Sequence, residues 1–228
     1  MPMAKELRIA VPNGGEVSAL LLRPAKAHCL LALAHGAGAG MHHAFLEELA
    51  AALAQAGVAT LRYQFPYMEQ RRKAPDKPAV LTATVQAAVH AAAEAAPGLP
   101  LFAGGKSMGG RMTSQAAALG LLPEVRGIVF FGFPLHPPNQ PGTKRADHLA
   151  QVSVPMLFLQ GTRDAFAPLP SIRAVCKKLG RRATMLVFEG ADHSFHVPKS
   201  SGKTDAQVLL ELAQATAAWT KQLVVAGL

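Results

Sequence analysis

Three polar residues far apart in this sequence have the types that nucleophilic catalysis requires: Ser107, Asp164 and His193. A serine hydroxyl is a poor nucleophile until a neighbouring imidazole removes its proton. That imidazole in turn needs a carboxylate, which fixes its tautomer and stabilises its cation. Serine, acid, histidine is one of the chain orders in which this arrangement occurs. We therefore expect these three residues to form a catalytic triad that attacks a carbonyl carbon.

Ser107 stands at the centre of residues 105–109, GKSMG, which fit the pattern G-x-S-x-G. An apolar run that starts at Leu101 precedes the motif, and a helix-compatible segment, 108–119, follows it. This context predicts a strand, a sharp turn and a helix, with the serine exposed on the turn in a strained conformation. Glycine is needed on either side because a side chain would clash where strand and helix approach each other. The alternative is a glycine-rich turn with an incidental serine.

Asp164 and His193 each follow a predicted strand directly, at the same edge of the sheet as Ser107. The alternative for Asp164 is a helix cap, although it lies early for that role. Asp192 is poorly placed to reach the ring of its chain neighbour His193, and we expect it to brace the loop. His196 is the rival base, and it lies farther from the strand end.

A tetrahedral intermediate needs two backbone donors for its oxyanion. We predict the N–H of Met108, the residue after the nucleophile, and the N–H of Ala37, with Gly38 as the alternative to Ala37. Small residues in that loop let the backbone approach a substrate, although the segment also fits a merely tight turn. Four residues in loops at this edge are expected to contact substrate: His35, Gly36, Gly38 and His136. No histidine or cysteine set has the paired spacing of a zinc motif, so we expect no metal and no cofactor.

Strands and helices alternate along the whole chain, with no repeat and no linker. The run 28–34 is almost continuously apolar, as in a strand buried on both faces. The strands are expected at 7–11, 17–23, 28–34, 58–63, in the run before Gly105, and at 127–133, 155–160 and 183–188. The helices are expected at 43–56, 78–96, 108–119, 145–152, 168–179 and 204–225. A loop rich in proline and charge is expected at 64–77.

This alternation predicts an α/β fold in one domain, residues 1–228, with a mostly parallel sheet of about eight strands and helices on both faces. The connection 133–155 is too short for a large lid. Loops at the carboxyl ends of the parallel strands should gather at one edge and form the site.

Composition narrows the class of protein further. Half of the 228 residues are hydrophobic, which is typical of a folded domain. No apolar run approaches the roughly 20 residues of a membrane span, and the start of the chain lacks the apolar core of a signal peptide. Cys29 and Cys176 are expected to be reduced and near the core, as in a cytoplasmic protein. The sequence carries no indication of oligomeric state.

The formal net charge is +9, and aromatic residues make up only 6% of the chain, too few for a base-stacking nucleic-acid platform. Basic residues recur in three loops expected at the catalytic edge: Arg71, Arg72, Lys73 and Lys77; Lys144 and Arg145; Lys199 and Lys203. One hypothesis is that they form an electropositive pocket mouth that favours an anionic substrate. The alternative is that they serve solubility alone.

Several stretches resemble the α/β-hydrolases, and more narrowly the small dienelactone-hydrolase-like proteins that include the testis-expressed hydrolase-like group. They are GGKSMGGR at 104–111, RGIVFFGFPLHP at 126–137, PMLFLQG at 155–161, ADHS at 191–194 and the closing helix. The resemblance covers most of the chain from Leu30 onward and implies the α/β-hydrolase fold and the triad. Dienelactone hydrolase itself uses a cysteine nucleophile, so the presence of Ser107 gives no support for lactone chemistry.

The resulting hypothesis is a serine hydrolase that acts on an ester or thioester of a small acyl group. Two alternatives stay open. One is a scaffold or binding protein that keeps the fold with an idle pocket, as in a branch of the family that has lost the nucleophile. The other is a small serine peptidase, which would usually carry an extra domain or lid.

Overall fold

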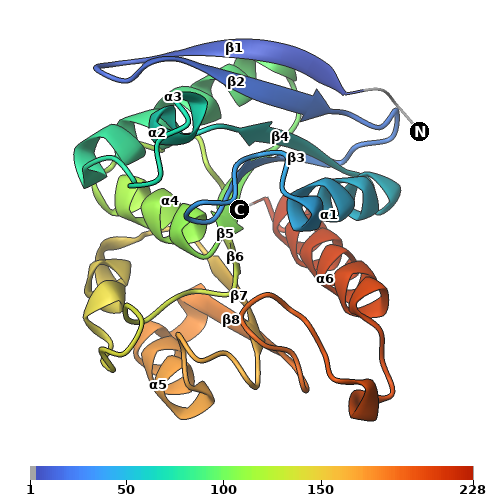
Figure 1. The fold of residues 1–228 in the computed structure, drawn as a ribbon. Coiled ribbons are helices and arrows are strands. Elements are labelled where there is room, and N and C mark those ends of the chain that lie inside the picture. The colour runs from blue at the N-terminus through green and yellow to red at the C-terminus, as the bar shows by residue number, and fades with distance from the viewer. Residues whose placement is uncertain (1–3, 228) are drawn as a thin grey trace.

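One sheet of eight strands runs from top to bottom through the middle of Figure 1, in a computed structural model that describes residues 4–227. The strands are β1 (Lys5–Val11), β2 (Gly15–Leu22), β3 (Cys29–Ala34), β4 (Val58–Tyr63), β5 (Leu101–Lys106), β6 (Ile128–Phe131), β7 (Met156–Gly161) and β8 (Ala183–Phe188). Their order in space is β1-β2-β4-β3-β5-β6-β7-β8. β1 and β2 pair antiparallel, as do β2 and β4, and all other pairs are parallel. The predicted α/β architecture is therefore confirmed.

Helices cover both faces of the sheet (Figure 1). On one face lie α1 (Ala44–Gln55) and α6 (Asp205–Val225), and on the other lie α3 (Pro78–Ala95), α4 (Met108–Ala118) and α5 (Leu169–Leu179). The remaining helical segments are short: α2 (Pro66–Glu69), η1 (Lys144–Gln151), η2 (Gly180–Arg182) and η3 (Lys199–Ser201). No long insertion covers the carboxyl edge of the sheet in the described part of the chain.

The continuous apolar run of β3 is explained by two separate cores, one on each face of the sheet. Successive side chains of a strand point to opposite faces. Leu31 and Leu33 accordingly join the core under α1 and α6, whereas Leu30 and Ala32 join the core under α3 and α4. All six residues of β3 are buried. A strand with helices on both sides cannot carry polar residues at alternate positions, so it reads as one hydrophobic run.

The strand order reverses at β3, and this reversal determines where a site can form. The chain leaves β3 through α1 and returns as β4 on one side, then crosses through α3 and returns as β5 on the other side. The loops after β3 and β5 therefore diverge and leave a crevice between the carboxyl ends of these two strands. Ligands bind at such reversal points in open α/β sheets.

One detail of the predicted secondary structure was wrong. The segment expected to be a loop, 64–77, contains the short helix α2. Pro66 stands at its first helical position, where the missing N–H has no partner to lose, and the buried ring of Tyr67 anchors it. The prolines and charged residues around α2 favour a loop, so the sequence pattern did not predict this short helix. The short helix expected around 145–152 is present as the 3₁₀ helix η1. Most other boundaries differ from the prediction by one or two residues.

None of the helices within residues 4–227 combines the length and the apolar composition that a membrane span requires.

Candidate active site

Ser107 lies on the turn between β5 and α4, with φ 51° and ψ −114°. A positive φ is costly for a residue with a side chain, and such strain is held only where the surroundings impose it. The glycines of the motif leave the required room: a Cβ on Gly105 would lie 2.5 Å from the carbonyl oxygen of Ala34, and one on Gly109 would lie 2.6 Å from that of His35. The end of β5 and the start of α4 therefore both pack closely against the end of β3, and Ser107 is held on the turn between them.

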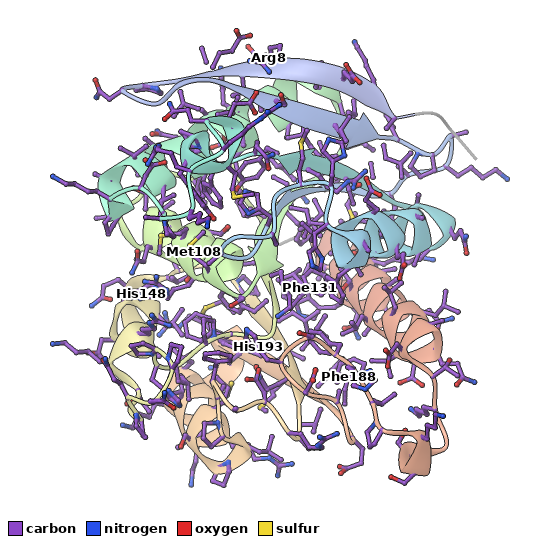
Figure 2. The ribbon with its side chains drawn as sticks, in the orientation of Figure 1. Arg8, Met108, Phe131, His148, Phe188 and His193 are labelled. Carbon is purple, nitrogen blue, oxygen red and sulfur yellow. The ribbon has the colours of Figure 1, made fainter. Side chains whose placement is uncertain are left out.

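A continuous hydrogen-bond chain joins Ser107, His193 and Asp164, three residues from three different loops. His193 Nε2 lies 2.8 Å from Ser107 Oγ, and His193 Nδ1 lies 2.7 Å from Asp164 Oδ2. A carboxylate can only accept, so Nδ1 carries the proton and Nε2 is left to accept from the serine hydroxyl. This is the geometry and tautomer that a serine nucleophile with a histidine base requires. His193, on the loop after β8, is labelled in Figure 2.

Asp164 is held in place by partners on both carboxylate oxygens, and its side chain is fully buried. Oδ2 accepts from the side-chain amide of Gln160 at 2.5 Å, and Oδ1 accepts from the backbone N–H of Phe166 at 2.8 Å. Gln160 is fixed in turn, because its Oε1 accepts from the N–H of Phe133 at 3.1 Å. The orientation of the acid is therefore set by β7 and by the loop after β6.

The ring of His193 is largely buried, and this burial lowers its pKa. Burial is the largest cause; the hydrogen bond to Asp164 opposes it, and the positive charge of Lys106 adds to the lowering. The ring packs against Phe166 with centroids 4.6 Å apart. A pKa below the usual 6.5 keeps the imidazole neutral near pH 7, which is the state that a general base needs.

Lys106 lies directly beneath the histidine loop. Its ammonium donates to the backbone carbonyl of His193 at 2.6 Å and lies 5.7 Å from the centre of the Phe195 ring. Burial lowers the pKa of Lys106 to about 8, and the charges of Asp164 and Asp192 oppose that lowering. Lys106 therefore positions the loop that carries the histidine and places a positive charge near its ring.

The two predicted oxyanion donors face the same cavity as the serine. Met108 (Figure 2) is the first residue of α4, where backbone N–H groups have no acceptor within the helix. Ala37 also lines the cavity, and among residues 4–227 its N–H has no hydrogen-bond acceptor. Gly38, the predicted alternative, donates its N–H to the hydroxyl of Tyr67 at 3.0 Å and does not line the cavity. Ala37 is thus the better placed donor of the two.

Of the other predicted substrate contacts, Gly36 lines the cavity, whereas His35 and His136 do not. His35 is fully buried: Nδ1 donates to the carbonyl of Gly36 at 2.7 Å and Nε2 accepts from the N–H of Phe65 at 3.1 Å. Burial lowers its pKa to about 4. His136 is also buried, with Nδ1 donating to the carbonyl of Pro137 at 2.8 Å. Both rings turn into the protein to serve backbone groups that a loop would otherwise leave unpaired.

Asp192 and His196 lie in the same loop as His193 but outside the chain of three. Asp192 Oδ1 accepts from the N–H groups of Ser194 and His196, at 2.8 and 3.0 Å, and so braces the loop. His196 Nδ1 lies 2.7 Å from Asp205 Oδ2 at the surface.

The cavity in front of Ser107 has a volume of about 570 Å³ and mostly apolar walls. Side chains from α1, α3, α4 and the loop after β7 supply these walls: Phe45, Leu46, Leu81, Met112 and Phe166. Ser107, Met108 and His193 all border it. The volume falls in the range of small-molecule pockets. Among residues 4–227, no three histidine, cysteine, aspartate or glutamate side chains gather closely enough to hold a metal ion.

Three residues of this site were not found from the sequence. Gln160 is a polar residue inside a buried strand, which was the available signal for a role toward Asp164. Lys106 belongs to the G-x-S-x-G motif, but nothing in the motif says that it reaches the histidine loop. Arg111, which also lines the cavity, lies four residues after the nucleophile, one helical turn along α4.

Comparison with known proteins identifies the class. Residues 27–221 match the family described as an alpha/beta hydrolase domain, and the chain belongs to that family. This confirms the α/β-hydrolase resemblance, and family membership makes the protein a hydrolase.

Solved structures agree on the fold. The chain is similar to a dienelactone hydrolase from Anabaena variabilis, with 22% identity, a TM-score of 0.76 and coverage of 97% of this chain and 98% of that one. It is similar to an alpha-beta serine hydrolase homologue from Coxiella burnetii, with 19% identity, a TM-score of 0.75 and coverage of 95% and 98%. It is also similar to a serine hydrolase without a lid from Xanthomonas campestris, with 18% identity, a TM-score of 0.73 and coverage of 95% of each chain. The dienelactone-hydrolase-like architecture is thereby confirmed, and the narrower likeness to the testis-expressed hydrolase-like group stays a prediction.

Proposed function

We propose that this protein is a serine hydrolase that cleaves a carboxylic ester or thioester of a small acyl group. The observation that carries the proposal is the hydrogen-bond chain from Asp164 through His193 to Ser107, which ends at an apolar cavity of about 570 Å³. A volume of that size suits a small molecule.

In the proposed reaction, Ser107 Oγ attacks the carbonyl carbon while His193 Nε2 takes the hydroxyl proton. Asp164 stabilises the imidazolium, and the N–H groups of Met108 and Ala37 bind the developing oxyanion. The tetrahedral intermediate then collapses, the carbon–oxygen or carbon–sulfur bond breaks, and Nε2 returns the proton to the leaving alcohol or thiol. Water repeats the sequence on the acyl-serine, releasing the acid and restoring Ser107. These steps use no metal and no cofactor.

The contacts around the three residues favour this function over a scaffold with an idle pocket. Gln160 and the N–H of Phe166 both serve Asp164, and Lys106 holds the loop of His193. A binding protein has no use for a strained serine within 2.8 Å of a correctly oriented imidazole. A peptidase is less favoured because such an enzyme would usually carry an extra domain or lid, and no long insertion covers the carboxyl edge of the sheet within residues 4–227.

We further propose that residues 1–228 form one domain that works in the cytoplasm without nucleic acid or membrane as a partner. Cys29 and Cys176 are both buried free thiols, and burial raises the pKa of each to about 11, which keeps them unreactive.

The test is hydrolysis of p-nitrophenyl esters and acyl thioesters of increasing chain length by the purified protein and by Ser107→Ala. We expect kcat/KM to be highest for short acyl groups and to fall at least about 10³-fold in the variant. An unchanged rate in Ser107→Ala, or no turnover of any ester or thioester by the wild type, would overturn the proposal.

A further inference from the structure

Arg111 is a cation on the wall of the cavity, one helical turn beyond the nucleophile on α4. Its Nε is buried and has no hydrogen-bond partner. No carboxylate among residues 4–227 lies within 4.0 Å of its guanidinium. Leaving a buried donor of a charged group unpaired is unfavourable, because the donor has lost its hydrogen bonds to water and has formed none within the protein.

A second arginine, Arg145 of η1, lines the same cavity. Its Nη1 donates to the carbonyl of His136 at 3.0 Å, which fixes the side chain at the wall. Arg145 lies close enough to Arg111 for the two charges to repel: burial first, and then the charge of Arg145, lower the pKa of Arg111 to about 10. Arg111 therefore remains charged near pH 7, and within residues 4–227 neither arginine forms an ion pair with a carboxylate.

Some other cations of this chain form ion pairs with carboxylates. Arg8 pairs with Glu69 at 2.9 Å, and Lys203 pairs with Glu211 at 2.6 Å. Asp76, a carboxylate on the cavity wall, is already engaged by the guanidinium of Arg72 and by the N–H of Tyr67, at 2.5 and 2.8 Å. The negative charge that would balance the arginine pair does not come from the cavity wall.

We infer that Arg111 and Arg145 form a subsite for a carboxylate or phosphate group carried by the substrate. The inference rests on the proposed function and specifies its substrate as an anionic ester or thioester. Four residues of helix rise about 6 Å, so the anion would lie a few bonds away from the carbonyl carbon attacked by Ser107. The planar guanidinium suits such a group because it offers two parallel N–H donors to two oxygens.

This subsite lies in a different place from the electropositive pocket mouth that was one hypothesis from the loop sequences. Of the basic residues in those loops, Arg145 lines the cavity, whereas Arg71, Arg72 and Lys73 do not. Arg111, whose Nε has no hydrogen-bond partner, belongs to a helix and therefore stood outside the loop pattern. Selection for an anion is therefore expected inside the cavity, where charges are screened by salt less than at a surface.

The first test measures binding without turnover. Calorimetry on Ser107→Ala compares monomethyl glutarate, methyl 4-phosphonobutanoate and the neutral dimethyl glutarate. We expect one of the two anionic esters to bind about 10- to 100-fold more tightly than the neutral ester. The one that binds more tightly shows whether the arginine pair prefers a carboxylate or a phosphate-like group. Ser107→Ala combined with Arg111→Met should bring that ratio to within about threefold of one. Equal affinities for all three esters in Ser107→Ala would overturn the inference.

The second test measures selectivity in turnover. The ratio of kcat/KM for p-nitrophenyl hydrogen glutarate to that for its neutral methyl ester is compared among variants. Both substrates are measured with the same enzyme preparation, so any loss of active enzyme through partial unfolding cancels from the ratio. Arg111→Met and Arg145→Met should each lower it about 10-fold or more, and Arg111→Lys should restore part of it. Lys144→Met is the matched control: it removes an exposed cation next to Arg145 that does not line the cavity, and the ratio should stay unchanged.

The outcomes separate the two proposals. Loss of all ester and thioester turnover would reject the proposed hydrolase, and the binding test would still report on the arginine pair. Turnover with a ratio that Arg111→Met and Arg145→Met leave unchanged would reject the subsite and leave the hydrolase standing.

Discussion

Two acid–histidine pairs lie in neighbouring parts of this protein and have the same separation, but they sit in opposite environments. His193 Nδ1 and Asp164 Oδ2 are 2.7 Å apart, with exposed side-chain fractions of 18% and 0%. His196 Nδ1 and Asp205 Oδ2 are also 2.7 Å apart, with fractions of 63% and 57%. The histidines are three residues apart in the chain. A short distance between an acid and an imidazole therefore does not by itself identify a catalytic pair.

The environments move the two pKa values in opposite directions. The hydrogen bond and the charge of Asp205 raise the pKa of His196, because the exposed ring loses little solvation. Burial lowers the pKa of His193 despite its equally short contact with Asp164. At pH 7 the buried ring is a base that can accept the proton of Ser107, whereas the exposed ring of His196 is more readily protonated. Burial and the serine partner distinguish the proposed catalytic histidine.

The largest expected effect separates the two histidines by activity. His193→Ala should lower kcat/KM for a short-chain ester by about 10⁴-fold, because no base remains to accept the serine proton. His196→Ala should change it by no more than about threefold. Initial rates with p-nitrophenyl acetate measure both. The reverse pattern would assign the base to His196.

A similar contrast is expected for the acids. Asp164→Asn should lower kcat/KM about 10³- to 10⁴-fold, because an amide at this position no longer selects the tautomer with a proton on Nδ1. Asp205→Asn and Asp192→Asn should lower it by less than about tenfold, since they only brace loops. Thermal melting of each variant checks that the fold is kept. A mild effect of Asp164→Asn on a folded protein would contradict its role.

The next prediction concerns the pH dependence of kcat/KM. In the wild type, the acid limb of kcat/KM should have its midpoint below pH 6.5, because the pKa of His193 is lowered. Lys106→Met removes a positive charge that helps to lower that pKa, so the limb should move to higher pH. Lys106→Arg keeps the charge and should stay nearer the wild-type midpoint. A midpoint that is the same in all three proteins would show that Lys106 only supports the loop.

The smallest effect concerns stability, and it extends the contrast to a histidine far from catalysis. The pKa of His35 is lowered from 6.5 to about 4 by burial. Below pH 6.5 the unfolded chain takes up a proton that the folded chain refuses, so stability falls as the pH drops from 6.5 toward 4. At pH 5 this amounts to about 2 kcal/mol.

Urea unfolding at pH 7.5 and pH 5.0 measures the total loss of stability, to which His148 adds because burial also lowers its pKa to about 4. NMR titration identifies the part that belongs to His35. The His35 ring should stay neutral at pH 5, while the His196 ring should titrate above pH 6.5. A His35 resonance that titrates near 6.5 would contradict the account.

The sequence predicted what depends on local pattern. The eight strands follow from apolar runs, and the position of Ser107 follows from glycines that must stand where β5 meets α4. Asp164 and His193 could be proposed because each follows a parallel strand, and parallel strands bring their ends together. The sequence also predicted that Asp192 braces its loop.

What escaped prediction depends on where side chains meet in space. His35 follows β3 in the way His193 follows β8, yet its ring turns inward to pair with backbone groups. Gln160 is held by the backbone N–H of Phe133, 27 residues away in the sequence, and Arg111 lines a cavity that exists only after folding. No spacing rule encodes those contacts, because they follow from the packing of several elements at once.

The most direct test of the central claim is covalent labelling with a fluorophosphonate, which reacts only with a serine that a working base activates. Mass spectrometry of the digested protein should find the label on Ser107, and not on Ser194, which also borders the cavity. Labelling should be lost in Ser107→Ala and His193→Ala and should keep its wild-type rate in His196→Ala. An unlabelled wild-type protein, or labelling that survives Ser107→Ala, would contradict the assignment of Ser107 as the nucleophile.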